Sequence, residues 1–342
     1  MILMHPKVSG QLERGDVAAV REALQTAVEL EHAVIPPYLY ALYSLVPRGN
    51  RTAAQIVRSV ADEEMLHLTL AANLLSAVGG SPVLDSPDVL PRYPGPLPGT
   101  VDDGLAVGLA PFSLALVRDT FMAIEEPEDP RDYGPAPVAP VPGPAGEPLT
   151  IGQFYRRIRR TLVALGEDAF TGARDRQVTT RLLHGAIAVT GVASACRAID
   201  TIIDQGEGTR ASPWDGTDVA HYYRFAEIVH GRRLIRVPTG QRYAYLGAPV
   251  TVNPAGIRDV PVNPTLAGYR AGGAAWRACK SFNYTYTTLL KALHATFNGA
   301  PGELRPAIDI MSSLQQQALD MMAGVTTDGV PAGPSFEWQP AD

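Results

Sequence analysis

Apolar residues recur at helical spacing along most of the chain, and the longest such pattern lies near its start. Between positions 16 and 45 they recur close to every 3.6 residues, which predicts one long helix. Pro36 and Pro37 lie inside it and predict a kink. A second helix is predicted over 53–78, with Thr52 as its N-cap. Because the loop between them is short, we expect these two helices to pack antiparallel.

Shorter helical patterns follow, separated by segments rich in proline and glycine. The stretch 81–100 predicts an ordered crossing segment, and 129–146 predicts an extended loop. Further helices are expected at about 111–126, 150–165, 180–204, 221–229, 273–297 and 301–322, with a hairpin or irregular segment over 236–264. The pattern therefore predicts an all-α fold. Residues 1–235 would form a helix bundle, and residues 236–342 would pack on it as part of one structural unit.

Composition narrows the class of protein. Of the 342 residues, 46% are hydrophobic and 19% charged, which is enough for a sizeable core. The net charge of −6 argues against a nucleic-acid partner, since such binders need a basic face. Neither a secretory signal nor an apolar stretch of roughly 20 residues is present, so no membrane partner and a cytoplasmic location are expected. The two cysteines, Cys196 and Cys279, lie in apolar stretches and are expected as buried thiols.

The sharpest local signal for chemistry is a glutamate followed three residues later by a histidine, Glu64-Met65-Leu66-His67. Residues three apart on a helix share a face, so both side chains can reach one ion. Their neighbours, such as Val60 and Leu68, are apolar. A carboxylate that points into an apolar bundle needs a partner, because burying an unpaired charge is costly. A divalent cation would be that partner. The alternative is a solvated glutamate beside a histidine at the helix edge.

Other carboxylates extend this signal to further helices. Glu31 lies in an almost uncharged part of the first helix, Glu125 ends the third, and Glu207 follows the apolar stretch 180–204. Di-iron bundles take one glutamate from each of two helices and a Glu-x-x-His pair from each of the other two. The second pair would be Glu207 and His221. On one continuous helix these two residues would lie roughly 21 Å apart, so His221 would have to approach by a non-helical path.

Iron suits carboxylate and neutral imidazole ligands, and manganese stays open for a site so rich in carboxylates. Three residues lie near the proposed ligands in sequence and are candidates for substrate binding, namely Tyr38, Tyr222 and Arg224. The alternatives are core packing for the tyrosines and a structural salt bridge for Arg224. The single histidines His32, His184, His230 and His294 are expected to be surface or hydrogen-bonded core residues.

Several of these segments together resemble a known family. The motifs on which this resemblance rests are Glu63-Glu64-Met65-Leu66-His67, Ile124-Glu125, Asp204-Gln205-Gly206-Glu207-Gly208 and His221-Tyr222. They resemble the ferritin-like domain of the iminophenyl-pyruvate dimer synthase family, known from the violacein and rebeccamycin pathways. The resemblance implies a ferritin-like four-helix bundle with additional C-terminal helices, a di-iron site and a place in natural-product biosynthesis. It favours Glu31 over Glu29, Glu125 over Glu126, and the pairing of Glu207 with His221.

One departure limits what the resemblance implies. The violacein and rebeccamycin enzymes are much longer, with a large segment before this domain, whereas the present chain begins almost directly with the first bundle helix. Oxidative coupling of two indole imines is therefore not expected to transfer.

The leading hypothesis is a non-haem di-iron oxidoreductase that activates dioxygen or peroxide. It would oxidise or couple a small molecule, either an amino acid or an amino-acid-derived imine. Its two iron ions would be held by Glu31, Glu64, His67, Glu125, Glu207 and His221. The alternatives are a manganese or iron peroxidase of the catalase type, a metal-storage bundle without turnover, and an accessory or scaffolding partner. Whether the chain forms a homodimer also stays open.

Overall fold

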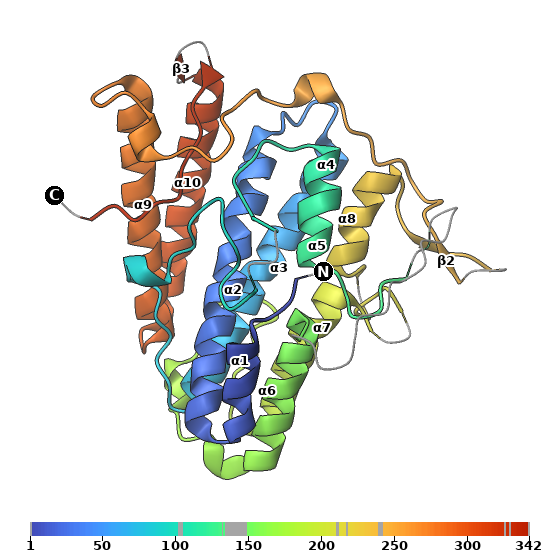
Figure 1. The fold of residues 1–342 in the computed structure, drawn as a ribbon, viewed down its shortest axis with the longest axis vertical. Helices are drawn as coiled ribbons and strands as arrows, with labels where there is room; N and C mark the ends of the chain where they lie inside the picture. The colour runs from blue at the N-terminus through green and yellow to red at the C-terminus, as the bar shows by residue number, and fades with distance from the viewer. Residues whose placement is uncertain are drawn as a thin grey trace.

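The fold is given by a computed structural model, which describes residues 2–101, 105–131, 133, 149–209, 212–216, 218–238, 242–324, 326–327 and 330–340. Helices dominate this part of the chain, as Figure 1 shows. The main helices are α1 (Pro6–Gln11), α2 (Val17–Ser44), α3 (Arg51–Ala77), α4 (Leu114–Leu116), α5 (Met122–Ile124), α6 (Ile151–Leu165), α7 (Val192–Glu207), α8 (His221–His230), α9 (Ala274–Phe297) and α10 (Leu304–Gly324). Short 3-10 turns and two small antiparallel pairs, β1 (Ile235–Arg236) with β2 (Tyr243–Ala244) and β3 (Thr326–Thr327) with β4 (Val330–Pro331), complete it.

The long helices α2 and α3 form the centre of the molecule, drawn in blue in Figure 1. Asp16 caps α2 by accepting a hydrogen bond from the backbone N–H of Ala19 at 2.7 Å. The predicted cap of α3, Thr52, is wrong, because the helix begins at Arg51 after Asn50. The buried side chain of Asn50 instead ties the start of α3 to the segment 253–256. It donates to the carbonyl of Gly256 at 2.9 Å and accepts from the N–H of Asn253 at 2.7 Å.

The other two bundle positions are each filled by two helical pieces. One piece runs through α4, a π-helical turn (Val117–Phe121) and α5, and the chain resumes as α6. The last position is shared by α7 and α8. In Figure 1, α4, α5 and α8 cover the upper part of the central pair, and α6 and α7 cover the lower part. Four helix ends therefore meet halfway along the bundle. The predicted start of α6 is confirmed, since Thr150 and Gln153 form a capping box.

The predicted helix over 180–204 is wrong in its first half, because α7 begins only at Val192. Residues before it form turns that lie against α3. The buried side chain of Asn73 holds them by donating to the carbonyls of Val178 at 2.7 Å and Ile187 at 3.0 Å. It also accepts from the N–H of Val178 at 3.0 Å. The apolar residues of this segment thus pack from a loop rather than along a helical stripe, with Ala186 and Val189 fully buried.

On the opposite side of α2 and α3 lie α9 and α10, drawn in orange and red in Figure 1. The C-terminal segment returns over α9, where Phe336 packs edge-on against Phe282 with ring centroids 4.9 Å apart. Of the two thiols, Cys279 is buried as predicted, whereas Cys196 is only half-buried. Across the described residues, no helix is both long and apolar enough to span a membrane.

The role of Asn73 generates a stability prediction. Asn73→Ala removes three hydrogen bonds and leaves their backbone partners buried without replacement, so we expect the free energy of unfolding to fall by about 2–4 kcal/mol. Denaturant titration measures this change. Gln55→Ala, an exposed position on the same helix, is the control and should change stability by less than about 0.5 kcal/mol. Equal effects of the two substitutions would contradict the anchoring role.

Candidate metal centre

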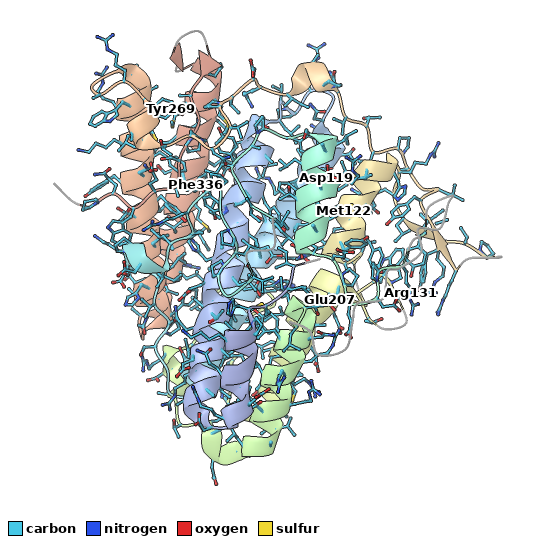
Figure 2. All side chains as sticks on the ribbon, viewed as in Figure 1. Asp119, Met122, Arg131, Glu207, Tyr269 and Phe336 are labelled. Atoms are coloured by element: carbon cyan, nitrogen blue, oxygen red, sulfur yellow. The ribbon has the colours of Figure 1, made fainter. Side chains whose placement is uncertain are left out.

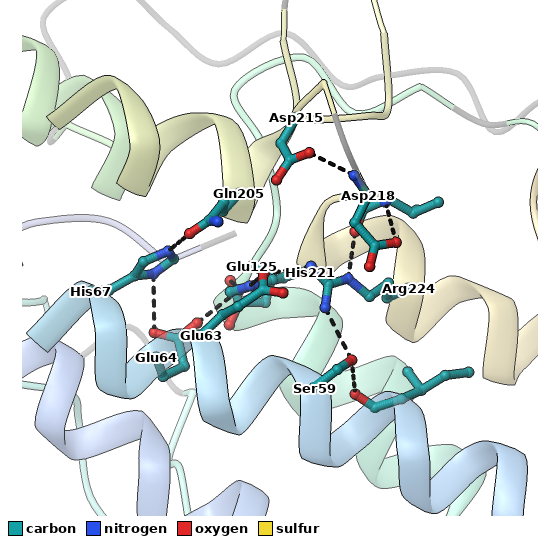
Figure 3. A network of polar contacts seen from close by, with 12 residues as sticks. Ser59, Glu63, Glu64, His67, Glu125, Gln205, Asp215, Asp218, His221 and Arg224 are labelled. Carbon is teal, nitrogen blue, oxygen red and sulfur yellow. Dashed lines mark hydrogen bonds and ion pairs between the residues drawn. The ribbon is translucent and has the colours of Figure 1, made fainter. Parts of the chain in front are cut away.

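Acidic and imidazole side chains meet where the four helix ends converge. Glu31 comes from α2, Glu64 and His67 from α3, Glu125 from the end of α5, and His221 from the first turn of α8. The side chains of Glu31, Glu64 and Glu125 are 8%, 3% and 9% exposed. Figure 3 shows Glu64, Glu125 and both imidazoles gathered between the helices. The broken helices thus solve the spacing problem of the sequence, since His221 enters from the start of a separate helix.

The distances place Glu64 between the two imidazoles. Nδ1 of His67 lies 3.5 Å from Oε2 of Glu64, and Nδ1 of His221 lies 2.8 Å from its Oε1. The two rings stack with centroids 5.2 Å apart. Glu31 approaches His67 at 3.8 Å, and Glu125 approaches His221 at 3.4 Å. Each imidazole therefore has one carboxylate of its own and shares Glu64 with the other.

The donor set fits divalent cations. Nδ1 of His221 is buried and faces two carboxylates, with Oε1 of Glu64 at 2.8 Å and Oε2 of Glu125 at 3.4 Å. Oxygen and nitrogen atoms of Glu64, His67 and His221 lie within 4.8 Å of one another. Arg224 and Arg156 pair with other carboxylates, Glu63 and Glu207. The buried carboxylates of the cluster thus gain no neutralising charge from these arginines, and carboxylate with imidazole is a donor set that suits iron or manganese.

The same crowding perturbs the acid–base properties of the cluster. Burial and the charge of Glu64 raise the pKa of Glu31 well above its usual value. Burial also opposes ionisation of Glu64, but the neighbouring imidazoles outweigh it and hold its pKa below the usual range. Burial alone would lower the pKa of His221, whereas hydrogen bonds to Glu125, Glu63 and Glu64 raise it well above normal. In the absence of metal, these shifts favour the protonated forms of Glu31 and His221.

The outer nitrogen of each histidine has its own partner. Nε2 of His67 lies 2.9 Å from Oε1 of Gln205, and Nε2 of His221 lies 2.9 Å from Oε2 of Glu63. Such contacts fix the ring orientation, so Nδ1 of each ring faces the cluster. Burial would raise the pKa of Glu63, but His221 and Arg224 lower it to about 2, so it is an anion at neutral pH.

Arg224 is a predicted ligand of a substrate carboxylate, with a structural salt bridge as the alternative. The structure places its side chain in a hydrogen-bond network inside the protein. Its buried guanidinium donates to Glu63 at 2.5 Å, to Ser59 at 3.0 Å and to the carbonyl of Val219, as Figure 3 shows. These bonds occupy the group inside the protein. They support a positioning role, in which Arg224 holds Glu63 against His221.

Tyrosines contact the outer edge of the carboxylates. Tyr38 donates to Oε1 of Glu125 at 2.5 Å, and Tyr155 donates to Oε1 of Glu31. Burial and the charge of Glu125 raise the pKa of Tyr38 well above normal, so it stays protonated. Tyr222, the other tyrosine proposed for substrate binding, packs edge-on against Tyr223 in a separate apolar cluster at 5.1 Å. Tyr38 therefore lies at the site, whereas the ring of Tyr222 packs against Tyr223.

Glu207 lies at the wall of the site rather than among the converging ligands. It is the last residue of α7 and is labelled in Figure 2. Its Oε2 pairs with Arg156 at 2.9 Å. Its carboxylate also lies so close to Gly152 that a Cβ there would be 1.9 Å from Oε1, so a larger residue at this position would displace the carboxylate. Glu207 and the carboxylates of Glu31, Glu64 and Glu125 line one small cavity of about 50 Å³.

Sequence reasoning did not assign a role to Glu63, Gln205 or Tyr155. Glu63 directly precedes the predicted ligand Glu64, and Gln205 lies two residues before the predicted ligand Glu207, so proximity in the sequence was the available signal. Tyr155 carried no signal, because its contact with Glu31 joins two helices, α6 and α2, that are far apart in the sequence.

Comparison with known proteins agrees with this geometry. A family model described as ferritin-like matches residues 24–230, more than half of the chain. The chain therefore belongs to the ferritin-like family, and the predicted fold is confirmed. It is 27% identical, over 92% of its length, to dichlorochromopyrrolate synthase from Lentzea aerocolonigenes, as the sequence motifs had indicated. The chain spans 35% of that protein.

A solved structure shows the same fold. The crystal structure of a ferritin-like protein from Caulobacter vibrioides aligns with a TM-score of 0.64 and 23% sequence identity. The alignment covers 93% of this chain and 97% of the other.

The retained protons generate a prediction on metal binding. Because Glu31 and His221 have raised pKa values, Fe²⁺ or Mn²⁺ must displace protons from the metal-free protein. We expect about one to two protons to be released per chain near pH 7, and the apparent affinity to rise with pH. Calorimetry in buffers of different ionisation enthalpy counts these protons. Binding without proton release, or affinity that falls as pH rises, would contradict the protonated cluster.

The outer contact of His221 gives a second prediction. Glu63→Gln weakens the hold on the His221 ring, so we expect affinity for Fe²⁺ to fall by about 10–100-fold. Asp62→Asn, an exposed neighbour on α3, is the matched control and should leave affinity near that of the wild type. Competition with a chelator measures both. Indistinguishable affinities for the two variants would remove Glu63 from the site.

Proposed function

We propose that this chain is a non-haem di-iron oxidoreductase that acts on a small molecule. Its ligands would be Glu31, Glu64, His67, Glu125, His221 and Glu207. The proposal rests on one observation. The buried carboxylate of Glu64 contacts the imidazoles of His67 and His221, and each imidazole has a further carboxylate beside it. Glu207 is assigned the sixth position because it lines the same cavity. This is the ligand set of the di-iron bundles, reached here through broken helices.

Iron bound at this site would supply the electrons and the coordination positions that dioxygen reduction requires. The protein's own residues then control the surroundings. Tyr38 and Tyr155 each hold one carboxylate oxygen by a hydrogen bond and keep a proton at that position. Apolar side chains such as Leu30, Val34 and Ile203 close the remaining wall against water. A volume of about 50 Å³ suits dioxygen or a water molecule, so the organic substrate would bind outside this inner space.

The substrate class rests on the family relationship. The matched relative is named as the synthase of dichlorochromopyrrolate. We propose that this chain likewise works in natural-product biosynthesis, on an amino acid or an imine derived from one. Because the chain spans about a third of that relative, joining two molecules is not part of the proposal.

Metal storage is the other use that ferritin-like bundles suggest. Storage requires many ions to pass through the site. Here the inner cavity is small, and Arg156 pairs with Glu207 at its wall. A small space whose wall carboxylate is already paired with Arg156 leaves little room for the repeated passage of ions. These features support turnover at a fixed centre over storage.

Metal content and oxygen consumption test the proposal together. Protein produced with excess iron should hold about two irons per chain. With a reductant, it should consume oxygen only when an amino acid or a 2-imino acid from an amino-acid oxidase is present. Mass spectrometry should detect a new oxidised product. We expect Glu64→Gln and His67→Ala to lose most of the iron and the oxygen uptake, because each removes a ligand from the centre.

The exposed residue His184 provides the matched control, since His184→Ala should retain both iron and activity. Storage would be identified instead by an iron content far above two per chain, together with oxygen uptake that does not depend on the substrate. Absence of bound iron and manganese in the wild type would contradict both functions.

A further inference from the structure

A second cavity lies on the other side of the central helices from the metal centre. It lies between α2 and α3 on one side and α9 and α10 on the other, opens at one end to the surface, and has a volume of about 250 Å³. Its walls are aliphatic and aromatic, and include Leu39, Leu290, Phe282, Phe297 and Phe336. Phe336 is labelled in Figure 2 on the side of the C-terminal helices. The proposed di-iron chemistry does not use this space.

One polar side chain that lines this cavity has a buried ring nitrogen without a hydrogen-bond partner among the described residues. His32 is 4% exposed and lines the cavity from α2. Its Nε2 lies 2.8 Å from the hydroxyl of Tyr286, whereas its Nδ1 is buried and has no partner in the described part of the chain. A buried nitrogen left in this way costs about 1–3 kcal/mol, and buried polar groups are nearly always satisfied. The site therefore lacks one hydrogen-bonding group next to an apolar space.

The volume of the cavity and the charge of its lining determine which kind of ligand it can hold. A cavity of about 150 Å³ lined by apolar side chains accepts benzene, so 250 Å³ accommodates a larger aromatic molecule. The charged residues of the lining, Arg58 and Asp62, are both exposed and belong to its mouth. An ionic group deep inside would thus be buried without a counter-charge, which is costly. A neutral ligand with one polar group meets both conditions.

We propose that this cavity binds a neutral aromatic alcohol of one or two fused rings, whose hydroxyl donates a hydrogen bond to Nδ1 of His32. The imidazole then carries its own proton on Nε2, directed at Tyr286. The rings of Phe282 and Phe336 form part of the surrounding wall. Binding at this site does not require iron, because α2 and α3 separate it from the metal centre.

Binding of 2-naphthol and of naphthalene to the full-length protein tests the proposal, in metal-free and iron-loaded form. We expect 2-naphthol to bind in both forms and more tightly than naphthalene. His32→Leu should weaken 2-naphthol about tenfold, the value of one hydrogen bond, and leave naphthalene nearly unchanged. Leu293→Trp fills the cavity and should abolish binding of both compounds. Leu319→Trp is the control, a half-buried leucine of α10 outside the cavity, and should bind normally.

A crystal structure of the wild type with 6-bromo-2-naphthol covers the case in which Leu293→Trp does not fold. Anomalous signal from bromine inside the cavity, with the hydroxyl on His32, supports the proposal. Bromine elsewhere, or a water molecule alone on Nδ1, overturns it. Binding at crystal concentration only, with none detectable in solution, overturns it as well, as does equal affinity of wild type and His32→Leu for 2-naphthol.

Discussion

The structure depends on placing several carboxylates inside an apolar bundle. Glu31, Glu64 and Glu125 are buried within reach of two imidazoles, and burying such groups without compensation costs many kcal/mol. The protein offers partial compensation through tyrosine hydroxyls and raised pKa values. The remainder calls for cations. A cluster of this kind is poorly suited to stabilising the fold by itself, which is why we regard it as a site for metal ions.

Breaking two of the bundle helices is the means by which the ligands meet. A continuous helix in the last position would separate Glu207 from His221 by roughly 21 Å. Instead α7 ends at one and α8 begins at the other, and both ends face the centre of the bundle. The first turns of α6 lie against the end of α7, where Gly152 and Arg156 contact Glu207. The π-helical turn before α5 lies next to the same region, where such irregularities are frequent at functional sites.

Much of the fold was predictable from the sequence, because α2, α3, α9 and α10 carry long apolar stripes with clear ends. The stretch 180–191 misled the helix prediction, since Asn73 binds the backbone around it as a loop and its apolar residues pack from there. At the site, Glu31, Glu64, His67 and Glu125 were predictable from carboxylates in uncharged contexts. His221 depended on family resemblance. The partners Glu63, Gln205 and Tyr155 were not predictable, because they meet their ligands through contacts between distant segments.

Anomalous diffraction at the iron edge, from crystals of the iron-loaded protein, tests the central claim most directly. Two iron peaks should lie in the bundle, one bound by Nδ1 of His67 and one by Nδ1 of His221, with Glu64 contacting both. A single peak, or iron bound away from Glu64, would contradict a di-iron centre at this position.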